Sequence, residues 1–188
     1  MLFAMLTVIT SFKHLSSSTI KKSKSIMSLK QLTLLLLIIL SSKALGQTKQ
    51  HNLRLAVLRK NIVGRDFVFK TEDNSTTHLK YLGVLRSKEG DIYKVMNSIW
   101  LWGQAHRATS RILIFNQNNK YLGNYYLTVT DDLPSFIKDN ELVFINKAKD
   151  SDCDLKSITR INFHSGIPSK FFRKCRGDSG DFYSFDSE

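Results

Sequence analysis

Two tryptophans stand two positions apart in the middle of the chain, and two arginines follow within the next nine residues. In an extended strand, side chains two positions apart point to the same side, so the two indoles would be neighbours there. Indole rings stack on nucleic acid bases or sugars, with about 1–3 kcal/mol gained per stacked base, and arginine pairs with anionic groups. The candidate ligand-binding residues are these four and two tyrosines of the following hairpin: Trp100, Trp102, Arg107, Arg111, Tyr125 and Tyr126.

The tryptophans belong to a segment, 92–102, that is rich in β-branched and aromatic residues and is therefore predicted to be a strand. One side of this strand is mixed in character and carries both indoles. The other side is largely apolar and is expected to face a core: Tyr93, Val95, Asn97, Ile99 and Leu101. Two interpretations of the tryptophans stay open. If a second layer covers the mixed side, they are core residues; if that side stays bare, they form an exposed shelf beside the arginines.

The histidines offer little support for metal or acid–base chemistry, because they are dispersed along the chain. No pair has the spacing of a helical zinc site, so we expect neither a metal nor a cofactor. By residue type alone, His164 with Glu141 and Arg160 resembles the acid, base and cation of small secreted ribonucleases. That resemblance implies an alternative function, a small secreted hydrolase, with a nuclease favoured by the positive net charge.

The segment Cys175–Gly180 (CRGDSG) resembles the nucleophile segment of chymotrypsin-like serine proteases, including the cysteine at its start. The resemblance implies Ser179 as the nucleophile. It covers six residues and ends at Asp181, where the family has glycine. The protease fold also needs a histidine in an Ala-Ala-His-Cys-like setting, and Gln104–Arg107 is a poor match for it. We therefore assign no catalytic residue.

The start of the chain has the layout of a secretory signal peptide. Leu32–Leu40 is apolar apart from Thr33, Lys30 precedes it, and the small residues Ala44 and Gly46 follow. A membrane-spanning helix needs about 20 apolar residues, roughly twice the length of this core. Cleavage after the last of these small residues is expected, and no stable membrane anchor should remain.

On this interpretation the chain divides into residues 1–46, leader and signal peptide, and residues 47–188, one mature β-rich domain. Translation from Met27 is an alternative that shortens the leader, and the destination is a periplasm or the cell exterior. The leader holds six lysines and no acidic residue, so the formal net charge falls from +12 for the whole chain to +6 for the mature part. Residues 47–130 carry net +8 and residues 131–188 net −2, which permits a basic surface on the first part.

Cys153 and Cys175 are the only cysteines, and both lie in the part that is expected to be exported. An even number of cysteines in an oxidising compartment indicates a disulfide. Closing a loop of this length stabilises a fold by about 3 kcal/mol, through restriction of the unfolded chain. We therefore expect a disulfide loop near the C-terminus.

Short strands and tight turns fill the chain from residue 67 onward. Polar sequences at 87–91 and 116–120 are typical of hairpin turns. Strands are expected at 67–69, 79–86, 92–102, 111–115, 121–129, 142–145, 158–163 and 182–185, with one helical turn at 134–138. Residues 51–62 fit either a first strand or a short helix. The predicted fold is mainly β: an antiparallel meander forming a small barrel or a sandwich, with little helix outside the signal segment.

These observations favour an exported, basic, β-rich binding protein without evident catalytic machinery. Its expected partner is a protein, a glycan or a polyanion. The alternatives are the secreted hydrolase described above and a structural component of the cell envelope that associates through sheet edges.

Overall fold

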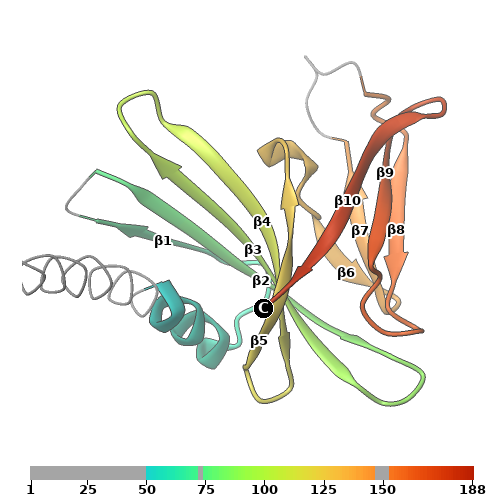
Figure 1. The fold of residues 1–188 in the computed structure, drawn as a ribbon, viewed down its shortest axis with the longest axis horizontal. Coiled ribbons are helices and arrows are strands. Elements are labelled where there is room, and N and C mark those ends of the chain that lie inside the picture. The colour runs from blue at the N-terminus through green and yellow to red at the C-terminus, as the bar shows by residue number, and fades with distance from the viewer. Residues whose placement is uncertain (1–49, 72–73, 147–152) are drawn as a thin grey trace, which may run out of the picture. The chain divides into compact units, whose positions relative to one another are not determined.

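Ten β-strands and one α-helix make up the part of the chain that the computed structural model describes, residues 50–71, 74–146 and 153–188 (Figure 1). The predicted leader and signal peptide, residues 1–46, lie outside the described residues. No helix in the described ranges is long and apolar enough to span a lipid bilayer. The helix covers residues 50–60, and the strands are β1 (Asp66–Lys70), β2 (Thr76–Arg86), β3 (Ile92–Trp102), β4 (Arg107–Asn116), β5 (Tyr121–Leu127), β6 (Phe136–Lys138), β7 (Glu141–Ile145), β8 (Ile158–Asn162), β9 (Lys170–Arg176) and β10 (Ser179–Ser187).

The strands form two antiparallel sheets. The large sheet has the order β1–β2–β3–β4–β5–β10–β9, and the small sheet has the order β6–β7–β8. Strands β1 to β5 follow one another as a meander, and β10 then pairs with the far side of β5. Because β1 and β9 are separate edges, the large sheet does not close into a barrel. The prediction of a mainly β, antiparallel meander is confirmed.

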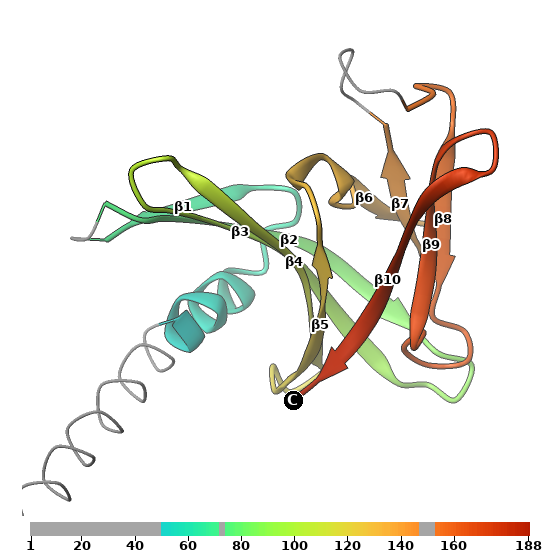
Figure 2. The same ribbon diagram turned by 45° about the horizontal axis from the view of Figure 1, so that its top comes forward.

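Side chains alternate along β3, so the large sheet has two faces, and both are covered near the middle of the strand. Figures 1 and 2 show the helix and the small sheet on opposite sides of the large sheet. We call the side toward the helix the helix face and the side toward the small sheet the inner face. On β3 the helix face carries Lys94, Met96, Ser98, Trp100 and Trp102, and the inner face carries Tyr93, Val95, Asn97, Ile99 and Leu101.

The helix covers the middle of the helix face with one apolar side. Leu53, Val57 and Leu58 lie one turn apart or adjacent on the same side of the helix, and they pack with Met96 of β3. Asn61 ends the helix in a left-handed conformation, φ 52°, and its N–H donates to the carbonyl of Leu58 at 3.2 Å. Of the two structures that the sequence allows for this segment, the helix is the one that forms.

The inner face packs on the small sheet over a shared apolar core. Leu142 and Phe144 of β7 belong to one buried cluster with Val95 of β3 and Tyr125 of β5. The ring of Phe171 on β9 lies 5.3 Å from that of Phe144, between centroids. The small sheet therefore makes the second layer of a sandwich-like arrangement.

The helical turn predicted at 134–138 is wrong. The turn lies earlier, as a 3₁₀ turn, η1 (Thr130–Asp132), and the predicted segment contains strand β6 instead. Pro134 holds the chain extended after the turn, and Ile137 then pairs with Leu142 of β7. Pairing with β7, rather than the local preference of these residues for a helical turn, determines the structure of this short segment.

Strand β9 does not appear among the predicted strands. Its apolar residues Phe171 and Phe172 are enclosed by Lys170 and Arg173, so the segment lacks a simple alternating pattern. It forms because it pairs antiparallel with β10, where Phe172 lies opposite Phe182. Strand β10 itself extends beyond the predicted 182–185 at both ends.

A disulfide joins Cys153 to Cys175 on β9, with the Cα atoms 4.4 Å apart, so the predicted bridge is confirmed. Asn146, directly after β7, donates from its side-chain amide to the carbonyls of Asp154 (2.8 Å) and Cys175 (3.2 Å). The N–H of Asp154 also donates to the carbonyl of Cys175, at 2.9 Å. The bridge and these hydrogen bonds connect the end of β7 in the small sheet to β9 in the large one.

A buried ion pair connects η1 to β9. A guanidinium nitrogen of Arg173 lies 2.7 Å from Oδ1 of Asp132, and both side chains are less than a tenth exposed. Arg173 also donates to the carbonyl of Asp131 at 3.2 Å, and the hydroxyl of Tyr183 donates to Oδ2 of Asp132. Both carboxylate oxygens are thus engaged, as a charge in the core requires.

Replacing Asp132 by alanine is expected to lower the free energy of unfolding by about 3–5 kcal/mol, because it leaves the Arg173 guanidinium buried without a counter-charge. The double variant Asp132→Leu, Arg173→Met removes both charges and should recover most of that loss. Urea unfolding followed by tryptophan fluorescence measures both effects.

The exposed ion pair between Glu141 and Arg160 supplies the matched control. Its atoms are 3.3 Å apart and both side chains are partly exposed to solvent. Glu141→Gln should therefore change the free energy of unfolding by no more than about 1 kcal/mol. A loss for Asp132→Ala as small as this control's would contradict a structural role for the buried pair.

The stability of the fold should depend on pH in the alkaline range. Burial raises the pKa of Tyr125, and burial together with the hydrogen bond to Asp132 raises the pKa of Tyr183. Unfolded tyrosine ionises near pH 10, so above about that pH the unfolded chain releases protons that the folded protein retains. The free energy of unfolding should hold below about pH 10 and fall as the pH rises further.

Urea unfolding at a series of pH values from neutral to alkaline measures this decline. The double variant Tyr125→Phe, Tyr183→Phe lacks both buried hydroxyls and should show a flatter alkaline profile. An equally steep decline in that variant would show that other groups cause the alkaline loss.

Candidate functional site

The β3–β4 hairpin places most of the candidate ligand-binding residues on the helix face. Trp102 lies opposite Arg107 in the register of the hairpin. Arg111 lies opposite Ser98 on one side and Tyr126 on the other. Because residues directly opposite share a face, the two indoles, the two guanidinium groups and one tyrosine ring are on the same side of the sheet. We call them the aromatic–arginine patch: Trp100, Trp102, Arg107, Arg111 and Tyr126.

Tyr125, the sixth candidate, does not lie on this surface. It is opposite Ile112 on the inner face, and none of its surface is exposed. Its ring contacts those of Phe171 and Phe185, and its hydroxyl donates to the carbonyl of Pro168 at 2.6 Å. Side chains alternate along β5, so Tyr125 points to the inner face because its neighbour Tyr126 points to the helix face. Tyr125 is therefore a core residue.

The two indoles of the patch stack on each other beyond the edge of the helix. The ring centroids of Trp100 and Trp102 are 5.7 Å apart with an angle of 25° between the planes. The guanidinium carbon of Arg107 lies 5.6 Å from the Trp102 ring, and the indole N–H of Trp102 faces the hydroxyl of Thr109 at 3.4 Å. Trp102 remains 37 % exposed. The stack is therefore held in place from several sides while part of it stays open to solvent.

A tight turn sets the register of this hairpin. Gly103 and His106 have positive φ angles of 70° and 47°, and the N–H of His106 donates to the carbonyl of Gly103 at 3.2 Å. The four-residue turn brings Trp102 and Arg107 directly opposite each other. His106 itself is exposed at the tip of the hairpin.

A third arginine, Arg54 of the helix, extends the cationic surface toward the helix. Its guanidinium carbon lies 5.4 Å from the ring centroid of Tyr121, and its Nε is buried without a hydrogen-bond partner in the described ranges. Burial lowers the pKa of Arg54, and the nearby positive charge of Arg111 lowers it as well, whereas Tyr121 and the negative charge of Glu188 act in the opposite direction. The sequence does not indicate this neighbour, because it leaves the helix and strand alternatives for residues 51–62 open.

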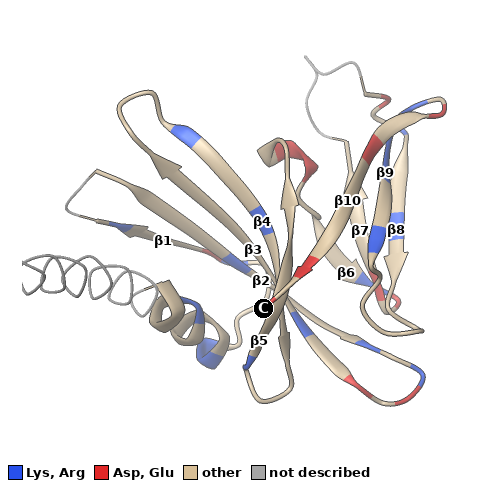
Figure 3. Cartoon of the chain, viewed as in Figure 1, with Lys and Arg blue, Asp and Glu red and all other residues tan. Residues whose placement is uncertain are grey.

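The arginines of the patch are not neutralised within the described part of the chain. The ion pairs found there join His78 to Asp66, Arg160 to Glu141 and Arg173 to Asp132, so none involves Arg107 or Arg111. Figure 3 shows basic residues along β4 and on the helix. The patch thus presents flat aromatic rings next to cationic groups that have hydrogen-bond donors to spare.

The residues of the hydrolase alternative do not come together as a catalytic set. Glu141 pairs with Arg160 on the small sheet, 3.3 Å apart. His164 lies in a turn after β8, where its backbone N–H faces Oδ1 of Asn162 at 3.3 Å and its carbonyl accepts from Lys88. No hydrogen bond or ion pair joins the His164 imidazole to either partner in the described ranges.

The protease-like segment is a β-hairpin. Ser179 begins β10 and lies opposite Arg176 of β9 across the Gly177–Asp178 turn. Gly177 has a φ of 53° in that turn. Within the described residues no histidine or carboxylate bonds the Ser179 hydroxyl, so the segment's resemblance to a protease nucleophile reflects the composition of a tight turn.

No group of three or more histidine, cysteine, aspartate or glutamate side chains in the described part of the chain could hold a metal ion. On the helix face, the stacked indoles of Trp100 and Trp102 lie beside the guanidinium group of Arg107. Comparisons of the whole chain with protein-family models, curated proteins and solved structures give no match.

Proposed function

We propose that this protein is a non-catalytic binding module, working outside the cytoplasm, that binds an anionic polymer through the aromatic–arginine patch. The observation that carries the proposal is the stack of Trp100 on Trp102 with Arg107 against it, on a surface that remains partly open. Stacking supplies contact area for a flat ring of the ligand. The guanidinium groups supply partners for its negative charges.

Pre-organisation of the stack favours binding. Arg107 and Thr109 both contact Trp102 in the absence of ligand, so little side-chain freedom remains to be lost when a ligand docks. Arg107 and Arg111 form no ion pair in the described residues, so their guanidinium groups can pair with an anion without breaking an existing ion pair. Both effects increase affinity without any rearrangement of the sheet.

Two further observations support the proposed compartment. Residues 1–46 carry the pattern of a secretory leader, and the Cys153–Cys175 bridge is the kind of bond that persists in oxidising compartments. In such a compartment an acidic polysaccharide is the favoured anionic polymer. Its rings offer apolar faces to indoles, and its carboxylate or sulfate groups match the fork of guanidinium donors.

The double variant Trp100→Ala, Trp102→Ala should bind heparin at least about tenfold more weakly than the unchanged protein, because it loses both stacking surfaces. Isothermal titration calorimetry measures the affinity, and thermal unfolding verifies that the variant is folded. Phe182→Ala removes a ring that is 68 % exposed on β10 and serves as the matched control. Full affinity of a folded tryptophan variant would contradict the placement of the site.

The double variant Arg107→Gln, Arg111→Gln should weaken binding mainly at low salt and reduce its dependence on salt. Each lost contact to a charged group lowers the slope of log affinity against log salt by about one. Heparin and single-stranded DNA are titrated in parallel at several salt concentrations. If DNA binds more tightly than heparin, the ligand class is nucleic acid rather than polysaccharide. Breakdown of either polymer would contradict a non-catalytic function.

A further inference from the structure

Strand β1 is an open edge of the large sheet. It pairs with β2 on one side, and no strand pairs with its other side in the part of the chain that the structure describes. Figures 1 and 2 show β1 at the border of the sheet, away from the small sheet. The loop before β1 continues in line with it, since the N–H of Gly64 donates to the carbonyl of Tyr81 on β2 at 2.8 Å. That loop extends the pairing with β2 and leaves the outer side of β1 open.

The opposite edge of the same sheet, β9, is occupied. The N–H of Lys174 donates to the hydroxyl of Thr159 on β8 at 3.0 Å. The carbonyl of Cys175 accepts from the backbone of Asp154 and from the side chain of Asn146. Residues in and beside the small sheet thus engage backbone groups of β9. Of the two edges, β1 is the one that offers a row of backbone groups for pairing with another strand within the described ranges.

The turn after β1 shows which of its backbone groups point outward. The N–H of Thr71 donates to the carbonyl of Ser75 at 3.0 Å and continues the register of β1 with β2, so Thr71 directs its backbone toward β2. Along an antiparallel pair, residues that bond to the partner strand alternate with residues that face away from it. The residues at odd distances before Thr71 are Lys70, Val68 and Asp66. Their N–H and C=O groups therefore point away from β2.

This outer edge is complementary to itself. Asp66 and Lys70 stand at the two ends of β1, and Val68 stands at its centre. All three side chains are on the inner face, because Val68 lies opposite His78 and His78 lies opposite Ile99. If a second copy pairs antiparallel about Val68, each Asp66 lies opposite the partner's Lys70, and the two valines lie opposite each other. Parallel pairing in register would instead place Asp66 beside the partner's Asp66, so charge favours the antiparallel arrangement.

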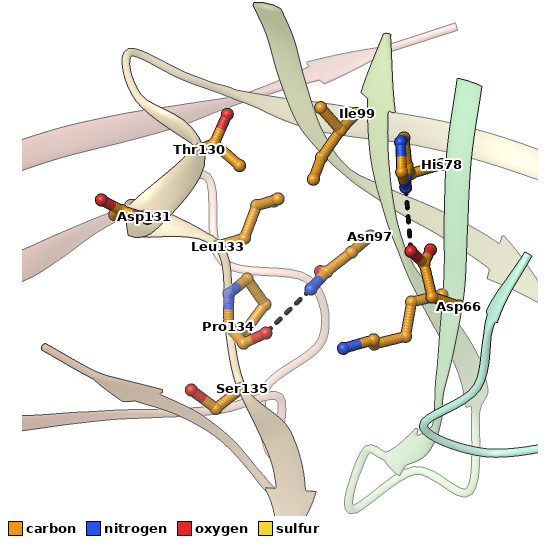
Figure 4. Close-up of a pocket in the computed structure, with 10 residues that line it drawn as sticks. Asp66, His78, Asn97, Ile99, Thr130, Asp131, Leu133, Pro134 and Ser135 are labelled. Carbon is orange, nitrogen blue, oxygen red and sulfur yellow. Dashed lines mark hydrogen bonds and ion pairs between the residues drawn. The ribbon is translucent and has the colours of Figure 1, made fainter. Parts of the chain in front are cut away.

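The side chains at this edge are accessible to a partner. Val68 is 50 % exposed, and Ile62 and Val63 in the loop before β1 are exposed as well. Nδ1 of His78 lies 2.8 Å from Oδ2 of Asp66 and orients that carboxylate on the inner face (Figure 4). The Asp66 side chain nevertheless remains 44 % exposed. The edge therefore combines apolar surface with an oriented negative charge that is open to a second cation.

We infer that β1 binds the β1 strand of a second copy of this chain, antiparallel and centred on Val68, so that two large sheets join into one. The outward backbone groups of Asp66, Val68 and Lys70 exchange hydrogen bonds with those of the partner, and the two Asp66–Lys70 ion pairs select the register. Because the strand is short, the interface is small and the dimer is weak and reversible. This inference goes beyond the proposed function and does not rest on it, since no residue of the aromatic–arginine patch takes part.

Sedimentation velocity of the full-length chain over a series of protein concentrations tests the association. The unchanged protein should shift from monomer toward dimer as the concentration rises. Val68→Pro removes the outward N–H and leaves the bonds between β1 and β2 in place, because that N–H does not point to β2. It should weaken dimerisation at least about tenfold, since each copy loses one hydrogen bond. Val68→Thr keeps the N–H and the β-branched shape, so it is the matched control and should still dimerise.

Exchange of the charges gives a second test, and thermal unfolding verifies the fold of every variant. Asp66→Lys places lysine opposite the partner's Lys70, and Lys70→Asp places aspartate opposite the partner's Asp66. Each variant alone should dimerise less than the unchanged protein. An equimolar mixture of the two should recover the dimer, because opposite charges again face each other. Mixing cannot repair a damaged fold, so recovery separates the interface from an effect on folding.

Three results would overturn the inference. The first is an unchanged protein that stays monomeric at every concentration. The second is a folded Val68→Pro variant that dimerises as well as Val68→Thr. The third is a mixture of the two charge variants that associates no better than either variant alone.

Discussion

As long as both charges are present, the buried ion pair of Asp132 with Arg173 constrains how the segment that crosses between the two sheets lies against β9. The crossing segment from β5 to β6 has little regular structure, and the carboxylate in η1 is its one charged attachment to β9. Two desolvated charges must lie within contact of each other, so this pair leaves η1 almost no freedom of position. Thr130, in the same turn, also shares a hydrogen bond with Ser110 of β4 at 3.0 Å. The ion pair and this hydrogen bond together hold η1 against β9 and β4, directly before the small sheet begins.

Covering layers on both faces of the large sheet restrict where it can recognise other molecules. The middle of β3 is buried on the helix side at Met96 and on the inner side at Val95, both without exposed surface. Burial decreases toward the turn that joins β3 to β4, where Trp102 and Arg107 are exposed. The hairpin is longer than the layers that cover it (Figure 1). The projecting end of the hairpin is held by the β3–β4 pairing, and its side chains Trp102 and Arg107 are exposed to solvent.

The sequence indicates local structure well and tertiary neighbours poorly. Strand 92–102 has the predicted bounds, since its β-branched and aromatic residues prefer an extended backbone in any context. The disulfide follows from the count of cysteines and the leader. The helix, β6 and β9 depend on partners far along the chain, and so does the position of Arg54 over the ring of Tyr121. The Asp131–Asp132–Leu133–Pro134 segment is a polar turn by its composition, and only the fold shows that its second acid is buried.

Charge pairing is distributed unevenly between the basic first part of the chain and its nearly neutral C-terminal part. The arginines that form ion pairs in the described residues, Arg160 and Arg173, both belong to the nearly neutral C-terminal part. The first part keeps its excess of positive charge, and the helix brings Arg54 close to Arg111. Arg54 also lies near the negative charge of Glu188, whereas Arg107 and Arg111 form no ion pair in the described residues. An anion bound at Arg107 and Arg111 would therefore stabilise the fold as it binds, because these two side chains form no ion pair in the described residues.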